Sequence, residues 1–583
     1  MRHREVGSGT RKLVLAGWAG ALMGSAAFIP AVAQVAPLPN CAGLAAQLLA
    51  NSNITAATSA VQPAADGHLS YCRVTVTVSD LSGPRDGYLP GQKQAIGVLI
   101  GLPLSAADGG SLGSQGNWNG SIRDQGGGGY AGVAESGGPI APLIDSGYAS
   151  SSTDTGHTTP GGGFALNPDG TLNWGLIRDF AFNGIHAQSL WTKKLVQMYY
   201  GKKHKYAYWT GCSTGGRQGH QQAQKYPKEY DGILAGDSAF NWDRFIPAEL
   251  WPQVVMKEKV GGPIAAAKLN AVTKAAITAC DGLDGIKDGV LQDPRACRYS
   301  AKAFVCRGSP NDPANCLTAA EAKAVDKIWD GVVENGKRLW FGLERGTPLE
   351  TGPYGISLAG PVPFPIATDH FRYWIKQDPS FDWHTLTEAS FIQAFKQSQR
   401  KFNDVIGTDD PDLSDFRNHG GKMITYNGLE DELIFPRGTF NYYDRVTERM
   451  GGFDRVQSFY RFFLYPGNNH CAFNMTQPNA PLINVEDLFK SLRGWVEDGV
   501  APDSLVAYNN LNPALATVSR PICKYPDKLV YDGTGSTNVA ANFRCKHREH
   551  DPLAETIRLT SDGNAKGDDD DDVDSQGSGR GKR

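Results

Sequence analysis

The pattern of hydrophobic and polar residues is clearest in three short segments, each of which predicts a β-strand. Residues 205–210 combine aromatic and small side chains and precede a polar, Gln-rich stretch at 216–226 with helical character. Residues 422–426 and 462–465 are short apolar runs that end in polar loops containing Gly and Asn. The first segment therefore predicts a strand, a tight turn and a helix in that order, as in an α/β protein.

Composition limits the classes of protein that fit this pattern. The chain has 583 residues, with 60 acidic and 57 basic side chains and a formal net charge of −3. A nucleic-acid-binding protein usually carries a basic surplus, so we expect no nucleic-acid partner. The 12 Trp, 24 Phe and 21 Tyr residues exclude disorder along the whole chain. The length allows three or four domains of about 150 residues, or one α/β domain with a large insertion.

The two ends of the chain differ from the rest. Residues 1–33 contain a basic start, an apolar stretch and Ala31-Val32-Ala33, a pattern typical of a cleaved export signal. A membrane anchor is the alternative, but the apolar run is shorter than the about 20 residues that span a bilayer. We therefore expect a secreted or periplasmic protein without membrane contact after signal removal. Residues 551–583, with an Asp run at 568–572, predict a disordered tail.

The chain has ten cysteines, and an even number in an exported protein predicts disulfides rather than zinc ligands. Their spacings suggest four local pairs, although sequence alone does not determine the connectivity: Cys41 with Cys72, Cys280 with Cys297, Cys306 with Cys316, and Cys523 with Cys545. Cys212 and Cys471 remain. If these two pair, they bring their neighbours Ser213 and His470 together.

Ser213 is the candidate nucleophile. Residues 211–215 match G-x-S-x-G, the strand-turn-helix pattern that exposes a nucleophilic serine in α/β-hydrolases. A second match at residues 109–113 lies in a stretch of Gly, Ser and Asp with no flanking periodicity. Only Ser213 follows a predicted strand and precedes a predicted helix.

The acid and the base of such a hydrolase follow the serine in the order Ser, Asp or Glu, His. Asp431 lies in the loop after the strand predicted at 422–426, with Glu430 as its rival and a helix N-cap as its alternative role. His470 lies in the loop after the strand predicted at 462–465. We predict that Ser213 attacks an acyl carbon, that His470 transfers the proton and that Asp431 orients the imidazole.

Stabilising the oxyanion requires two backbone N–H groups. Thr214 follows the nucleophile and supplies one of them. An early Gly-rich run at 126–132 is the candidate for the other. A flexible loop or a phosphate cradle is the alternative for this run, but no Gly-Lys-Ser/Thr follows it.

Together these segments resemble the tannase and feruloyl esterase family, which includes a bacterial hydrolase of mono(2-hydroxyethyl) terephthalate. The matching segments lie at residues 118–120, 126–129, 211–217, 230–233, 280–285, 428–431 and 466–471. The resemblance implies an α/β-hydrolase core at 34–238 and 412–550, with an inserted lid at 239–411. It also implies Gly129 as the second oxyanion donor and the five disulfides Cys41–Cys72, Cys212–Cys471, Cys280–Cys297, Cys306–Cys316 and Cys523–Cys545. Asn427 departs from the terephthalate enzyme, which has His there.

The family's lid also binds calcium, and by similarity the loop at 281–290 is the corresponding site. Its carboxylates at short spacing, with interleaved Gly, suit a hard cation, although the spacing is not that of an EF-hand. An Asp/Gly turn without metal is the alternative. The resemblance implies a structural Ca²⁺ held by five residues: Asp281, Asp284, Asp288, Ile286 and Val290.

We therefore predict a serine esterase that acts on esters of small aromatic acids of the feruloyl or galloyl type. The alternatives are a hydrolase of other aryl or terephthalate-type monoesters, an inactive polyphenol- or carbohydrate-binding protein on the same fold, and a secreted peptidase. The predicted lid contains five aromatic residues, Phe371, Tyr373, Trp374, Phe381 and Trp383. They could stack on the substrate or pack in the hydrophobic core, and we favour packing in the core. The resemblance to the terephthalate enzyme, whose lid binds a substrate carboxylate with an Arg, suggests the same role for Arg372, but Arg372 is not among the predicted site residues.

Overall fold

The computed structural model describes residues 38–79, 88–89, 91–307 and 316–558. The predicted export signal at 1–33 and the acidic run at 568–572 lie outside these residues. Within the described part of the chain, no helix combines the length and apolar character needed to cross a membrane.

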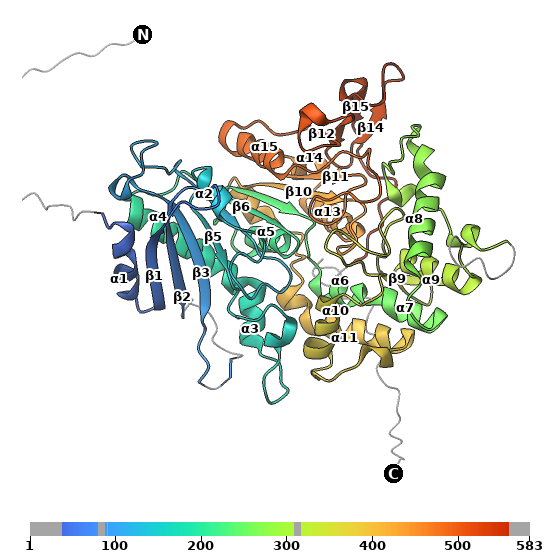
Figure 1. Cartoon of the computed structure of the whole chain (residues 1–583), viewed down its shortest axis with the longest axis horizontal. Coiled ribbons are helices and arrows are strands. Elements are labelled where there is room, and N and C mark those ends of the chain that lie inside the picture. The colour runs from blue at the N-terminus through green and yellow to red at the C-terminus, as the bar shows by residue number, and fades with distance from the viewer. Residues whose placement is uncertain (1–37, 80–87, 90, 308–315, 559–583) are drawn as a thin grey trace, which may run out of the picture. The chain divides into compact units, whose positions relative to one another are not determined.

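A parallel sheet of five strands forms the centre of the fold, in the order β11-β10-β7-β6-β4 (Figure 1). Its strands are β4 (Ser121–Gln125), β6 (Tyr206–Cys212), β7 (Gly232–Gly236), β10 (Lys422–Gly428) and β11 (Tyr460–Tyr465). Every residue of β7 is buried, because both faces of this parallel sheet are covered. The three segments that the sequence predicts as strands are β6, β10 and β11. Because the strands are parallel, the loops that follow them meet at one edge of the sheet.

An antiparallel sheet extends the parallel one. It has the order β1-β2-β3-β5, formed by β1 (Ile54–Gln62), β2 (Tyr71–Val78), β3 (Ile96–Pro103) and β5 (Ser150–Thr153). The N–H of Arg123 in β4 donates to the carbonyl oxygen of Ala149, next to β5, at 2.9 Å and so joins the two sheets. The short helix α1 (Leu44–Leu49) packs beside β1 (Figure 1).

Helices cover both faces of the sheet, because successive strand side chains point to opposite sides. On one face, Trp209 and Ile233 pack in a cluster with α4 (Gly184–Tyr200), α5 (Thr214–Lys225), α13 (Pro436–Met450) and α14 (Phe453–Gln457). On the other face, Tyr208 and Leu234 pack against α15 (Val485–Asp498). The remaining helices of the core are short: α2 (Ala141–Asp145), α3 (Trp174–Arg178) and α12 (Ser414–Asn418).

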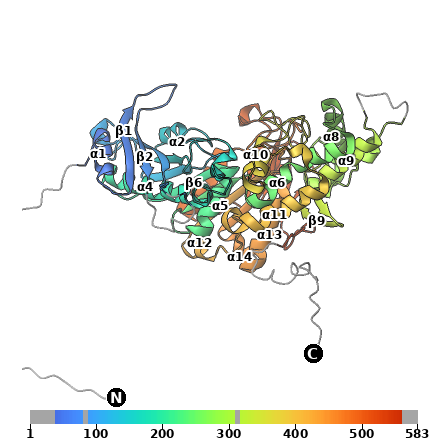
Figure 2. The same cartoon turned by 90° about the horizontal axis from the view of Figure 1, so that it is seen from below.

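The segment between β7 and β10 is a large insertion at the position of the predicted lid. It contains α6 (Trp242–Glu249), α7 (Trp251–Val260), α8 (Ala266–Cys280), α9 (Ala319–Asp330), α10 (Pro365–Asp369), α11 (Glu388–Ile406), β8 (Val332–Glu334) and β9 (Lys337–Trp340). In Figure 2, as in Figure 1, α8 and α9 lie at the end of the body away from β1 and β2. One hydrophobic cluster combines Trp242 and Phe371 of the insertion with Tyr130 and Leu433 of the core. The lid therefore packs on the core through shared apolar side chains.

Five disulfides link all ten cysteines, and the predicted pairing is confirmed. The pairs are Cys41–Cys72, Cys212–Cys471, Cys280–Cys297, Cys306–Cys316 and Cys523–Cys545. The last of these ties together the two C-terminal hairpins, which are formed by β12 (Ser504–Tyr508) with β13 (Ser519–Cys523) and β14 (Lys528–Tyr531) with β15 (Phe543–Lys546).

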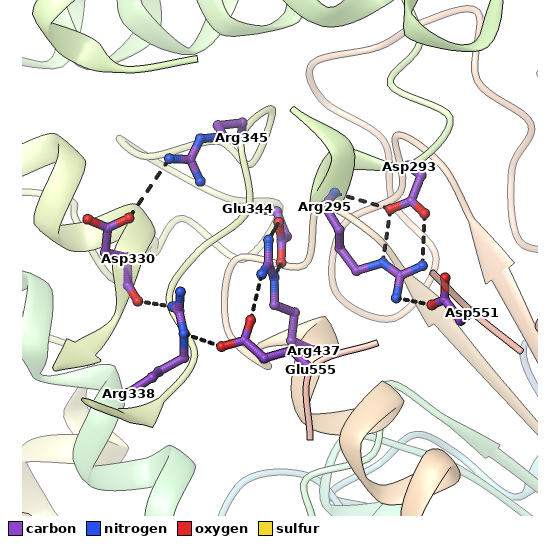
Figure 3. Close-up of polar contacts among 9 residues, drawn as sticks. All are labelled: Asp293, Arg295, Asp330, Arg338, Glu344, Arg345, Arg437, Asp551 and Glu555. Atoms are coloured by element: carbon purple, nitrogen blue, oxygen red, sulfur yellow. Dashed lines mark hydrogen bonds and ion pairs between the residues drawn. The ribbon is translucent and has the colours of Figure 1, made fainter. Parts of the chain in front are cut away.

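Ion pairs attach the C-terminal segment to the lid and the core (Figure 3). Arg437 of α13 contacts both Glu344 of the lid and Glu555. Asp551 is only 8% exposed and pairs with Arg295 of the lid at 2.6 Å. The predicted start of the tail at residue 551 is too early, because the buried Asp551 and the more exposed Glu555 both form ion pairs with the folded body.

Candidate active site

Ser213 occupies the sharp turn between β6 and α5. Its backbone angles, φ 60° and ψ −124°, are rare for a residue other than glycine and are held by its surroundings. The Ser213 N–H donates to the Gly236 carbonyl oxygen at 3.0 Å. Glycine is required on both sides, because a Cβ on Gly211 would lie 2.6 Å from Gly215, and one on Gly216 would lie 2.4 Å from the Gly236 oxygen. This is the strand-turn-helix that the sequence predicts.

His470 and Asp431 lie in the loops that leave β11 and β10. His470 Nδ1 is 2.8 Å from Asp431 Oδ2, and the Asp431 side chain is fully buried. The other oxygen of Asp431 accepts hydrogen bonds from the N–H groups of Leu433 and Ile434, both at 2.8 Å. The N-cap alternative for Asp431 is wrong, because the following helix, α13, begins at Pro436 and has Phe435 as its N-cap. The rival Glu430 instead accepts a hydrogen bond from the Gly467 N–H.

The Cys212–Cys471 disulfide joins the neighbours of Ser213 and His470, with 5.9 Å between the Cα atoms of the two cysteines. Among the described residues, no hydrogen bond joins Ser213 Oγ to His470. Both side chains line the same cavity.

Asp237 is a second buried acid beside this pair, and the sequence analysis did not identify it. It follows β7 directly, and its carboxylate accepts hydrogen bonds from the N–H groups of Cys471 at 2.9 Å and Gly428 at 2.8 Å. Carboxylate and imidazole atoms of Asp237, Asp431 and His470 lie within 4.8 Å of one another. Burial and then the charge of Asp431 raise the pKa of Asp237 well above its usual value. The sequence signal that could have identified Asp237 is its position directly after a buried strand.

The charges around His470 favour its protonated form. Burial lowers the pKa of the imidazole, but Asp431, Asp237 and Glu432 together raise it to about 9. The Glu432 carboxylate accepts a hydrogen bond from the backbone N–H of His470 at 3.2 Å. Burial and the charge of Asp431 raise the pKa of Glu432 to about 7. A positive charge on the His470 imidazole is therefore stabilised at this position.

The two predicted oxyanion donors lie together at the cavity. The Thr214 hydroxyl donates to the Gly129 carbonyl oxygen at 2.6 Å, which fixes the Gly-rich loop against the start of α5. The loop is further held by the Gly127 N–H, which donates to the Gln218 side chain at 2.8 Å. Gly129 has φ +53°, a left-handed conformation that suits glycine. Gly129 and Thr214 line the same cavity as Ser213.

The cavity has a volume of about 790 Å³ and a mostly apolar wall. One face of α6 provides part of this wall through residues at helical spacing: Trp242, Phe245, Ile246 and Glu249. Leu433 and Ile434 continue the apolar surface, and Tyr354 and Phe473, which are 51% and 46% exposed, line the cavity where it meets solvent. Sequence analysis missed these residues, although the periodicity of α6 directly after β7 was visible.

Several sequence candidates lie elsewhere. None of the five lid aromatics lines the cavity, and Phe371 and Trp374 are fully buried, which supports the core interpretation. Arg372 also lies outside the cavity and donates to the Phe381 carbonyl oxygen at 3.3 Å. Ser111, from the second G-x-S-x-G match, is exposed in a loop.

The acidic loop at 281–290 offers carboxylate oxygens as donor atoms for a calcium ion. Asp281 Oδ1 accepts hydrogen bonds from the N–H groups of Asp288 and Gly289, and Asp284 Oδ1 accepts one from Ile286. The second oxygens of Asp281 and Asp284 have no hydrogen-bond partner among the described residues. Asp288 instead pairs with Arg520 at 2.8 Å. The oxygen donors suit Ca²⁺, but the three carboxylates do not form a group with all ligand atoms within 4.8 Å of one another.

Known proteins are similar to this chain in sequence and in fold. The family profile described as "Tannase and feruloyl esterase" matches residues 112–546. A probable feruloyl esterase of Arthroderma benhamiae is 35% identical over 493 residues, which are 82% of this chain and 86% of the relative. The crystal structure of feruloyl esterase B from Aspergillus oryzae has a TM-score of 0.71 at 28% identity, covering 87% of this chain and 99% of that one. Tannin acyl hydrolase from Aspergillus niger is 23% identical and has a TM-score of 0.70, covering 85% of this chain and 92% of that one. At this identity the comparison shows a similar fold.

Proposed function

The chain belongs to the tannase and feruloyl esterase family and is a carboxylic ester hydrolase, and we propose that Ser213, His470 and Asp431 form its catalytic triad. The observation that carries this proposal is the 2.8 Å contact between His470 and Asp431 on the cavity that Ser213 lines. The disulfide between Cys212 and Cys471 supports this proposal, because it covalently links the residues next to the nucleophile and the base.

The mechanism proceeds through an acyl-enzyme. Ser213 Oγ attacks the ester carbonyl carbon while His470 Nε2 takes its proton, and His470 then passes this proton to the departing alcohol. Water, deprotonated by His470, attacks the acyl carbon, and the acid leaves as Ser213 regains its proton. Asp431 accepts the hydrogen bond from Nδ1–H, which keeps Nε2 free to act as the base and stabilises the imidazolium.

We assign the N–H groups of Gly129 and Thr214 to the oxyanion hole. The 2.6 Å hydrogen bond from the Thr214 hydroxyl to the Gly129 carbonyl oxygen holds the two residues next to each other. Two preorganised donors stabilise the charge that develops on the carbonyl oxygen in each tetrahedral intermediate.

We propose esters of small aromatic acids, of the feruloyl or galloyl type, as the substrates. A mostly apolar cavity of about 790 Å³ is large enough for such an acyl group and part of its alcohol. The family supports the same class of ester, because the relatives named above include a probable feruloyl esterase.

We further propose that the protein acts outside the cytoplasm. Five disulfides in one chain are typical of an oxidising compartment. The N-terminal sequence supports export, and processing near residue 33 is tested by N-terminal sequencing of the protein from the culture medium or periplasm of a host. Retention of residues 1–33 in the mature protein would contradict the export signal.

A structural Ca²⁺ in the lid is a separate proposal. The side chains of Asp281, Asp284 and Asp288 and the carbonyls of Ile286 and Val290 would hold it. The support is the donor set of the loop: one oxygen of Asp281 and one of Asp284 are held by backbone N–H groups of the same loop, which brings these carboxylates into one turn. Burial and then the nearby charges of Asp288 and Asp281 raise the pKa of Asp284, so a cation would relieve this repulsion. The ion would cross-link the loop and take no part in ester cleavage.

The calcium proposal is tested by thermal unfolding in Ca²⁺ and in chelator. We expect Ca²⁺ to raise Tm in the wild type and in Asp169→Asn, a variant of an exposed turn, but not in Asp284→Asn. Equal unfolding of the wild type with and without Ca²⁺ would show that the loop is a turn without metal.

The ester hydrolase proposal is tested with methyl ferulate, methyl gallate and mono(2-hydroxyethyl) terephthalate. We expect wild-type turnover of a ferulate or gallate ester, its loss in Ser213→Ala, and its retention in Ser111→Ala, which changes the serine of the second G-x-S-x-G match. Activity that survives in Ser213→Ala would overturn the triad. Preference for the terephthalate ester would overturn the substrate class.

A further inference from the structure

Glu249 is the one acid on the cavity-lining face of α6. It is the last residue of this helix and lies one turn beyond Phe245 and Ile246 on the same face. The three other residues of the face are Trp242, Phe245 and Ile246, which are apolar and at most 2% exposed. Glu249 itself is 1% exposed.

The carboxyl group of Glu249 has no hydrogen-bond partner among the described residues. Both of its oxygens are buried and unpaired, whereas Asp431, Asp237 and Glu432 in the same region all accept hydrogen bonds. Buried polar groups are nearly always paired in folded proteins, because leaving one unpaired is costly. An unpaired carboxyl on the wall of the active-site cavity therefore indicates that a ligand completes its bonding.

The surroundings favour the neutral acid. Burial and then the negative charge of Asp431 raise the pKa of Glu249 well above its usual value. The cavity lining contains one arginine, Arg123, and both ends of its guanidinium pair with Glu486 at 2.7 and 3.0 Å. A neutral carboxylic acid both donates and accepts a hydrogen bond. Its natural partner is a neutral hydroxyl group. Among the described residues, the cavity lining contains no lysine and its one arginine is already paired, so an anionic substrate group finds no unpaired guanidinium or ammonium group there.

The position of Glu249 assigns it to the acyl side of the cavity. His470 must face the leaving alcohol to protonate it. The ring of Tyr354 lies 6.0 Å from the His470 ring and 5.5 Å from that of Phe473, and both aromatic residues are about half exposed, so the alcohol leaves on this open side. Trp242, Phe245 and Ile246 of α6 and residues 433–434 supply a buried, apolar part of the cavity lining, which suits a flat aromatic acyl group.

We propose that Glu249 is a specificity-determining residue that hydrogen-bonds a ring hydroxyl of the acyl group, so that the enzyme selects hydroxyaryl esters over unsubstituted and carboxylated ones. This inference rests on the proposed ester hydrolase function and adds the chemical feature by which the substrate is recognised. A site built to pair with a hydroxyl discriminates strongly against the analogue that lacks it, because the buried partner is then left unpaired.

The test compares kcat/KM for methyl p-coumarate and methyl cinnamate, which differ by one hydroxyl. In the wild type we expect about a 10- to 100-fold preference for the coumarate. In Glu249→Leu we expect the ratio to fall to about one, mainly through loss of coumarate turnover, with cinnamate turnover unchanged or improved. Glu249→Gln keeps a donor and an acceptor and should retain most of the preference. Glu549→Leu makes the same substitution at an exposed position and should behave as the wild type.

A second series uses the wild type alone and does not depend on the folding of any variant. Monomethyl terephthalate carries a carboxylate where methyl 4-hydroxybenzoate carries a hydroxyl, and we expect at least about 10-fold lower kcat/KM for the carboxylate. Equal turnover of coumarate and cinnamate by the wild type, an unchanged ratio in Glu249→Leu, or equal loss on both substrates would overturn the role of Glu249. Absence of any ester turnover by the wild type would instead contradict the proposed function.

Discussion

His470 Nδ1 lies 2.8 Å from Asp431 Oδ2, although the two residues belong to different strand-end loops and stand 39 positions apart in the chain. The contact arises because β10 and β11 are adjacent and parallel, so their exit loops meet. Asp431 is fixed from behind by the N–H groups of Leu433 and Ile434. The Asp431 carboxylate that contacts His470 is therefore itself held in one orientation.

Replacing Asp431 by Asn should remove most of the activity. The amide presents a donor or a neutral acceptor to Nδ1, so the imidazole no longer holds the tautomer that leaves Nε2 as a base. We expect kcat to fall about 10⁴-fold. The matched control is Glu430→Gln, which changes the adjacent acid and leaves the His470 contact intact. Steady-state kinetics on a p-nitrophenyl ester measure both variants, and equal losses would contradict the assignment of Asp431.

The pH dependence of kcat/KM should reflect the acids around His470. Catalysis requires the neutral imidazole, and the folded-state pKa of His470 is raised to about 9, so activity should rise with pH on the acid limb. The negative charge of Glu432 stabilises the protonated imidazole and so raises the pKa of His470. Glu432→Gln removes this charge and should shift the acid limb to lower pH. Glu549→Gln, at an exposed site, should not. An unchanged limb in Glu432→Gln would contradict the electrostatic account.

Removal of the Cys212–Cys471 disulfide should reduce both stability and activity. The bridge closes a separation of 259 residues, whereas Cys306–Cys316 closes 10. In the chain-entropy account the longer loop contributes about 5 kcal/mol to the free energy of unfolding and the shorter about 3 kcal/mol.

The double variant Cys212→Ser/Cys471→Ser is compared with Cys306→Ser/Cys316→Ser by denaturant unfolding and kinetics. We expect the control pair to keep its kcat, because it lies outside the cavity. A loss of kcat that is equal in both pairs would show that the bridge at the triad has no special catalytic role.

Asp237→Ala should destabilise the loop that carries His470. The change leaves the N–H groups of Cys471 and Gly428 and the side-chain amide of Asn427 without their acceptor. We expect a loss of at least about 3 kcal/mol in the free energy of unfolding, because three buried donors lose this acceptor and each unpaired donor costs about 1–3 kcal/mol. Asp169→Ala, in an exposed turn, is the control. Unfolding in urea with no difference between the two variants would contradict this role.

The sequence by itself determined the local chemistry of the site. The turn around Ser213 requires glycines at fixed positions, and the loops after two apolar strands carry Asp431 and His470 in the order that hydrolases use. These features are local, so spacing and residue type were sufficient to predict them. The disulfide partners followed from the family resemblance and are confirmed in the structure.

Only the tertiary structure decided which side chains share the cavity. Asp431 rather than Glu430 meets His470 because the backbone turn at residues 431–434 directs one carboxylate inward and the other toward Gly467. Asp237 and Glu249 join the site through strand pairing and lid packing, which connect segments with no local pattern in common. The lid aromatics, conversely, are apolar enough for a substrate pocket but are used in packing the lid. Burial by distant segments is a property of the folded chain, and spacing along the sequence does not encode it.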